Sequence, residues 1–230
     1  MKYNDEEMND FSYELAIEND KRTFCIYYVS LLKAKHLLFF SFCYNNDYNS
    51  KIIKMDLFFV SFATLYTVNA LFFDDDTMHK IYVDKGKFNL QYQFPKIVFS
   101  SLISMVINTV LNLLALSNSG IIDFKHNKST KDVDERGNSL KNKLKIKFAF
   151  YFIICFIFLL FFWYYISLFG AIYRNTQLHL LKDTLLSFIL SLIYPFGIYL
   201  LPGIFRIPAL SNEKKKRKCL YSFSKLLQIF

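Results

Sequence analysis

FAFYFIICFIFLLFFWYYISLFGAI, residues 148–172, is a run of 25 residues that contains no Asp, Glu, Lys or Arg. As a helix it would be about 37 Å long, enough to cross a bilayer hydrocarbon core of about 30 Å. The run is apolar on every face, whereas a helix of a soluble protein concentrates its apolar residues on one face. The run therefore predicts a membrane-spanning helix.

Three further charge-free runs occupy residues 57–73, 97–116 and 185–201. The four runs together predict an all-α polytopic membrane protein with four transmembrane helices and interfacial helices near both ends. We expect four parts: an acidic cytoplasmic tail (1–22), an interfacial amphipathic segment with a polar turn (23–56), a four-helix transmembrane module (57–205) and a basic amphipathic tail (206–230).

The apolar segment 23–43 is interrupted by Lys33, Lys35 and His36. Each Lys at the centre of a spanning helix costs about 2.5 to 3.5 kcal/mol on insertion scales. We therefore expect an interfacial or re-entrant helix here rather than a fifth span. Within the fourth run, Pro195 and Gly197 predict a kink or a break.

The charge distribution predicts the orientation of the chain. Of its 28 Lys and Arg residues, 22 fall in residues 1–56, 117–147 and 202–230, and six fall in the two remaining loops. Cytoplasmic segments carry the excess of Lys and Arg in membrane proteins, so both termini are predicted to be cytoplasmic. The net charge of +9 is thus accounted for by segments that lie next to the cytoplasmic face of a membrane. We therefore expect no nucleic-acid partner.

A basic cluster near the C-terminus is the strongest candidate lipid-binding site. It consists of Lys214, Lys215, Lys216, Arg217 and Lys218. Each cation near an anionic leaflet contributes about 1 kcal/mol, and an apolar face with Leu220, Phe223, Leu227 and Phe230 follows the cluster. We expect the tail to lie on anionic lipid at the cytoplasmic face. The alternative is a plain stop-transfer anchor.

Asparagine side chains interrupt two of the apolar runs. Asn108 and Asn112 are separated by one helical turn in the second run, and Asn69 lies near the end of the first. Polar side chains in lipid either hydrogen-bond between helices or line a polar path. Both interpretations stay open, with helix packing favoured over a path.

Sequence motifs of catalysis and cofactor binding are missing. The chain has no HExxH, GxSxG, CxxC or Gly-rich phosphate loop, and only four scattered His residues. The acidic group at Asp74, Asp75 and Asp76 with His79 follows no known calcium-loop spacing, and we interpret it as a solvated helix end. We expect no enzymatic activity, no catalytic residue, no cofactor and no bound metal.

Several stretches resemble a known group of proteins. They are YNSKIIKMDLFF (48–59), TVNALFFDDDTMHKIY (67–82), FFWYYISLFGAIYRNTQLHLLKDTLLSF (161–188) and YPFGIYLLPGIFRIPAL (194–210). The chain from about residue 20 onward resembles the C-terminal multi-pass module of large surface proteins of ciliates and other protists, which is distantly similar to the membrane part of polycystins. That resemblance implies a sensor or channel-associated role. The eleven-residue link 173–183 is too short to provide the filter loop of a polycystin-type pore, so we expect no pore from this chain alone.

Two hypotheses for function follow. The first is a non-enzymatic membrane module that anchors or assembles a larger complex, as a homo- or hetero-oligomer. The alternative is a subunit of a transporter or polycystin-like cation channel, in which Asn69, Asn108 and Asn112 line a path. Only the alternative predicts flux across a membrane.

Overall fold

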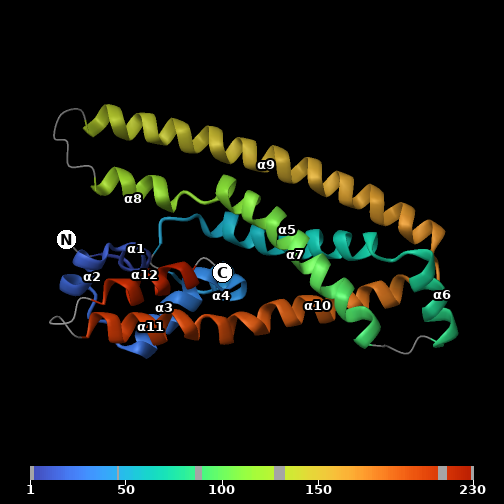
Figure 1. Cartoon of the computed structure of the whole chain (residues 1–230). Helices are drawn as coiled ribbons and strands as arrows, with labels where there is room; N and C mark the ends of the chain where they lie inside the picture. The colour runs from blue at the N-terminus through green and yellow to red at the C-terminus, as the bar shows by residue number, and fades with distance from the viewer. Residues whose placement is uncertain (1–2, 46, 86–89, 127–132, 212–216, 229–230) are drawn as a thin grey trace. The chain divides into compact units, whose positions relative to one another are not determined.

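The computed structural model describes residues 3–45, 47–85, 90–126, 133–211 and 217–228 (Figure 1). Within these ranges every regular element is a helix, and four helices are long and apolar enough to cross a membrane. The predicted all-α polytopic fold class is confirmed. The chain divides into two compact units, Met1–Lys54 with Leu192–Phe230, and Met55–Ser191. We call them the terminal unit and the membrane unit and describe each by itself.

The terminal unit combines helices from both ends of the chain. Its complete helices are α1 (Asp5–Asp10), α2 (Tyr13–Asn19), α3 (Phe24–Lys35), α4 (Leu37–Phe42), α11 (Leu200–Leu210) and α12 (Lys218–Leu227). The predicted boundary between transmembrane module and basic tail, at residue 206, falls inside α11.

Local capping signals start the first two helices. The Asn4 side chain accepts the Glu7 N–H at 2.7 Å, and the Glu7 carboxylate accepts the Asn4 N–H at 2.8 Å, which is a complete capping box. Ser12 caps α2 through the Leu15 N–H. Asp5, Glu6, Glu7 and Glu14 lie in the first turns of these helices, where carboxylates are favourable.

Segment 23–43 forms two short helices that break at His36. His36 has extended backbone angles, and its Nε2 lies 2.7 Å from the Leu192 carbonyl oxygen. Its ring also packs between those of Phe39 and Phe196, with centroid distances of 5.1 and 4.6 Å. This break keeps either helix from reaching the length of a membrane span. The interfacial position of the segment stays a prediction.

The membrane unit holds the longest helices. Its helices are α5 (Lys51–Leu71), α6 (Asp75–Val83), α7 (Leu90–Ala115), α8 (Asn118–His126), α9 (Val133–Ile172) and α10 (Gln177–Ile198), of which α6 and α8 are short, and of which α5 begins and α10 ends in the terminal unit. Pro195 and Gly197, where we predicted a kink or a break, lie inside α10, and the interruption between α10 and α11 is the single residue Tyr199. The 22 residues of α10 give a length of about 33 Å, enough for one span.

Three pieces of packing hold the membrane unit together. The Phe188 ring of α10 lies edge-on to Phe58 and Phe62 of α5, at 5.5 and 5.1 Å. Lys96 at the start of α7 donates to the Phe72 carbonyl at the end of α5, at 3.2 Å. A buried apolar cluster joins α5, α9 and α10 and contains Ala70, Phe73, Phe169 and Leu180. Contacts of this kind position the polar groups described next.

Candidate functional site

The predicted lipid-binding cluster is only partly within the described residues. Lys214, Lys215 and Lys216 lie outside them. The backbone N–H of Arg217 donates to the Tyr13 hydroxyl at 3.1 Å, and Lys218 Nζ lies 3.1 Å from a Glu14 carboxylate oxygen. The described end of this cluster therefore contacts the acidic N-terminal segment.

Helix α12 is amphipathic, and its buried face is more polar than predicted. Tyr221 and Ser224 are buried, whereas Leu220 and Phe223 remain exposed. The Phe223 ring also meets Phe205 of α11 edge-on at 5.0 Å. The exposed apolar side of α12 is compatible with the predicted contact with a membrane surface.

A buried charge network lies at the centre of the terminal unit. The side chain of Arg206 in α11 has no exposed surface, and its guanidinium donates to Asp20 Oδ2 at 2.8 and 3.0 Å. Arg22 donates to both carboxylate oxygens of the same Asp20, at 2.7 and 2.8 Å. Burial alone would raise the pKa of Asp20, but the hydrogen bonds and charges of Arg22 and Arg206 outweigh it and hold that pKa below its ordinary value.

Neutral groups also stabilise the buried positive charge of Arg206. Arg206 also donates to the carbonyl oxygens of Met8 at 2.6 Å and Asn9 at 3.3 Å, and its guanidinium lies over the Tyr27 and Tyr221 rings at 5.1 and 4.8 Å. Carbonyl oxygens and aromatic faces stabilise a desolvated guanidinium. The network links α1, the segment after α2, α3, α11 and α12.

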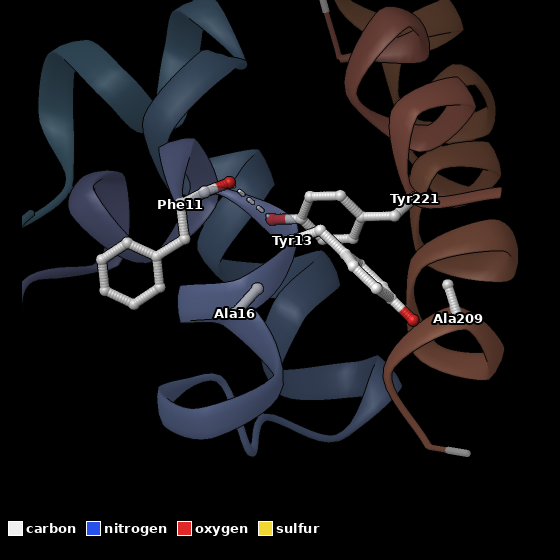
Figure 2. Close-up of a cluster of buried hydrophobic side chains, with 5 residues drawn as sticks. All are labelled: Phe11, Tyr13, Ala16, Ala209 and Tyr221. Carbon is white, nitrogen blue, oxygen red and sulfur yellow. Dashed lines mark hydrogen bonds between the residues drawn. The ribbon is translucent and has the colours of Figure 1, made fainter. Parts of the chain in front are cut away.

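An apolar cluster beside the network joins the two ends of the chain. Figure 2 shows Tyr221 of α12 pointing its hydroxyl at the Phe11 carbonyl, to which it donates at 2.8 Å. Ala16 of α2 and Ala209 of α11 are fully buried in the same cluster, together with Tyr13. The N- and C-terminal segments thus form one core.

In the membrane unit, one predicted asparagine forms a bond between two helices. Asn69 Nδ2 in α5 donates to Thr184 Oγ1 in α10 at 3.1 Å, and both side chains are buried. Tyr151 of α9 donates to Asp56 of α5 at 2.7 Å in a similar way. The sequence left two roles open for Asn69, a hydrogen bond between helices or a place in a polar path. The bond to Thr184 favours the first of them.

Replacement of Asn69 by Leu is expected to weaken the packing of α5 against α10. Interhelical hydrogen bonds of this kind contribute about 0.6 to 1.7 kcal/mol in membrane proteins, and the change leaves Thr184 buried without that donor. The loss is measurable as a lower midpoint of denaturation in detergent micelles. Asn69→Leu in a Thr184→Val background should show little further loss, and an equal loss there would contradict the pairing.

The asparagines of α7 are placed differently. Asn108 is half-buried and Asn112 is exposed, one turn apart, and no hydrogen bond joins either side chain to Asn69 among the described residues. Ser104, one turn before Asn108, is buried. Asn108 Oδ1 and Ser104 Oγ have no partner in the described part of the chain. We call Ser104, Asn108 and Asn112 the α7 polar strip.

The acidic group at residues 74–76 serves helix structure. Asp74 caps α6 by accepting the Thr77 N–H at 2.9 Å and lies 3.3 Å from Lys96 Nζ, while Asp75 accepts the Tyr173 hydroxyl at 2.9 Å. Thr77 and Lys96 lower the pKa of Asp74 through these hydrogen bonds, although the little burial there acts in the opposite direction. No cluster of metal-ligating side chains occurs among the described residues.

A small pocket of about 220 Å³ opens in the terminal unit. Glu6 of α1 and Lys33 of α3 line it, together with Asp47. Asp47 pairs with the buried Lys54 at 3.0 Å. Burial, with added repulsion from Asp47 and Asp10, raises the pKa of Glu6 to about 7, although Lys35 and Lys54 act in the opposite direction.

The terminal unit is therefore expected to lose stability as pH rises from about 4.5 to 7. In this range folded Glu6 keeps its proton while unfolded Glu6 releases it, so the unfolded state binds fewer protons. Glu6→Gln mimics the protonated form and is expected to remove this pH dependence and to stabilise the unit at pH 8 by about 1–2 kcal/mol. Denaturation at pH 5 and pH 8 measures it. The exposed Glu18→Gln is the control, and equal pH slopes in Glu6→Gln and the native chain would refute the expectation.

The sequence analysis predicted none of the residues of the charge network, although one of them, Arg206, is unusual in its sequence context. Arg206 stands between Phe205 and Ile207 in an otherwise apolar stretch. A cation in such a stretch requires a buried acid or backbone acceptors. Its partner Asp20 lies 186 positions earlier, in a segment that composition alone describes as a solvated tail.

No protein-family model, curated protein or solved structure matches this chain. The resemblance to protist surface proteins and to polycystins stays a prediction.

Proposed function

We propose that the chain is a non-enzymatic polytopic membrane module that assembles with further membrane helices and anchors a larger complex. The α7 polar strip is the observation that supports this proposal most strongly. Its members, Ser104, Asn108 and Asn112, recur every fourth residue and lie on one side of the helix. Among the described residues none provides these side chains with a partner between helices.

The energetics of lipid favour a partner for this strip. A polar group in hydrocarbon without a hydrogen bond costs several kcal/mol, since no water is present to replace the missing partner. Helices of membrane proteins satisfy such groups by hydrogen bonds between helices. Ser104 Oγ and Asn108 Oδ1 are enclosed by the chain itself, so a second copy of the chain or another subunit would bond to the exposed Asn112 and to the accessible part of the half-buried Asn108.

The exposed apolar surface of α9 is consistent with assembly. Only 11% of the most apolar stretch of α9 is buried by the rest of the chain. Aromatic and aliphatic side chains such as Phe156, Phe161 and Trp163 remain exposed. This surface can contact either lipid or the helices of a partner. It therefore supports a membrane location, whereas the argument for a partner rests on the α7 polar strip.

The terminal unit supports the part of the proposal that concerns orientation. Helices α1 and α2 share a core with α11 and α12, which supports a location of both chain ends on the same side of a membrane. Four spans have the same consequence. The excess of Lys and Arg in the segments next to these ends favours the cytoplasmic side.

The size of the complex in native membranes tests the proposal. Mild detergent extracts of cells that express the full chain are separated by native gel electrophoresis. Asn108→Leu with Asn112→Leu is expected to shift the chain from an oligomer to a monomer. Thr109→Val is the matched control, because the Thr109 hydroxyl already donates to Met105 within α7. A monomeric native chain, or equal effects of both changes, would refute the proposal.

The same strip also permits the alternative function, a subunit of a transporter or polycystin-like cation channel. In an oligomer, Asn108 and Asn112 would then line a polar path rather than a contact between helices. Purified chain in liposomes would show cation flux that is lost on Asn108→Leu. Assembly without flux favours the anchoring module, and flux in the native chain favours the alternative.

A further inference from the structure

The N-terminal part of α9 and the short helix α8 form an antiparallel pair in the membrane unit. A Cβ atom at Gly120 of α8 would lie 3.7 Å from Leu140, and one at Gly137 of α9 would lie 3.9 Å from Phe124. Both distances are those of ordinary van der Waals contacts, so the two helices pack against each other here. Arg136 lies over the Phe124 ring at 5.4 Å and adds to this contact.

A groove of about 410 Å³ runs along this helix pair. Ile121 and Phe124 of α8 form one wall. The other wall is a stripe of α9 with Leu140, Leu144 and Phe148, spaced at three to four residues so that they lie on one face. Phe148 is also the first residue of the charge-free run of α9. The groove therefore reaches the level at which α9 enters hydrocarbon.

Two exposed lysines border the groove. Lys141 and Lys145 line it one helical turn apart, and both are exposed. Among the described residues no acidic side chain forms an ion pair with either of them. Two other cations differ from them, because Lys147 donates to the Leu116 carbonyl at 2.6 Å and Lys218 pairs with Glu14.

We propose that this groove binds an anionic phospholipid of the bilayer. The headgroup phosphate lies between the ammonium groups of Lys141 and Lys145, and the proximal acyl carbons contact Leu144 and Phe148. The lysine stems line the groove while their charged ends reach the headgroup level. Charge complementarity and the position at the start of the apolar run both select a lipid with a net negative charge.

Spin-labelled lipids test this site in vesicles that hold the full chain. The vesicles contain four parts phosphatidylcholine to one part phosphatidylserine, and electron spin resonance measures the motionally restricted fraction of each labelled lipid. Phosphatidylserine is expected to be restricted in preference to phosphatidylcholine. Lys141→Gln and Lys145→Gln are each expected to lower this preference about fivefold, the factor that corresponds to about 1 kcal/mol per cation.

Lys143 supplies the matched control. It lies on the same helix and is exposed, but does not line the groove. Lys143→Gln should leave the preference unchanged if the groove holds the lipid, whereas general attraction to an anionic surface would make all three changes equivalent. Lys145→Arg keeps the charge and should keep the preference. No preference in the native chain, or equal losses in all three Gln variants, would overturn the proposal.

Discussion

Asp20→Asn is expected to destabilise the terminal unit by about 3–5 kcal/mol. The change removes the only carboxylate that contacts both Arg22 and Arg206 among the described residues and leaves two guanidinium groups facing each other in a buried site. Removing one partner of a buried ion pair has this magnitude, because the remaining charge keeps its desolvation penalty. Hydrogen exchange of the amides in α2 and α11 measures the loss as faster local opening.

An exposed ion pair of the same unit provides the control for Asp20→Asn. Lys218 and Glu14 are each 68% exposed at their side chains, and their Nζ and Oε1 atoms lie 3.1 Å apart. Exposed pairs contribute about 0–1 kcal/mol, so Lys218→Gln should leave exchange in α2 nearly unchanged. Equal protection in Asp20→Asn and the native chain would show that the network does not hold the two chain ends together.

Gly203→Val is expected to separate α11 from α3, with a loss of about 2–3 kcal/mol. A Cβ atom at this position would lie 2.7 Å from Phe24 Cε2 and 3.4 Å from Tyr27 Cδ1, closer than packed carbon atoms tolerate. The clash forces the ring or the helix to move, as in other overpacked cores. Because Tyr27 also faces Arg206, the displacement should extend to the charge network.

Gly197 in α10 is the matched control for Gly203. No atom lies within 4 Å of the Cβ that Ala would add there, and Ala is favoured over Gly inside a helix by about 0.5–1 kcal/mol. Gly197→Ala should therefore be neutral or stabilising in a denaturation experiment. Adding Phe24→Ala to Gly203→Val should restore much of the lost stability. A Gly203→Val chain as stable as the native chain, together with no rescue by Phe24→Ala, would contradict the close approach of α3 and α11.

The four spans were predictable because hydrocarbon excludes charge, which is a local property of the sequence. The ends of the helices were not. Helix α9 begins at Val133, 15 residues before the apolar run at Phe148, because Lys and Asn continue a helix outside the membrane as readily as apolar residues do. Similarly, α5 begins at Lys51 rather than at Leu57. Hydropathy locates the bilayer, whereas backbone hydrogen bonds determine where each helix starts.

The candidate sites were predictable only where a single residue carries the signal. Asn69, Asn108 and Asn112 stand out as polar residues in apolar runs, but the sequence does not tell which finds a partner within the chain. Within the described ranges only Asn69 does so, because its helix packs against Thr184 of α10. The association of the two chain ends was out of reach, since it depends on contacts between residues far apart in the sequence, such as Tyr221 with Phe11.

Glycosylation mapping in microsomes tests the central claim, a four-span chain with both ends in the cytoplasm. The sequence holds one Asn-x-Ser/Thr site, at Asn127, outside the described residues and in a loop predicted to be cytoplasmic. A second site is introduced next to Asp84, between α6 and α7. The account predicts that Asn127 stays unmodified while the new site is glycosylated, and glycosylation of Asn127 would contradict it.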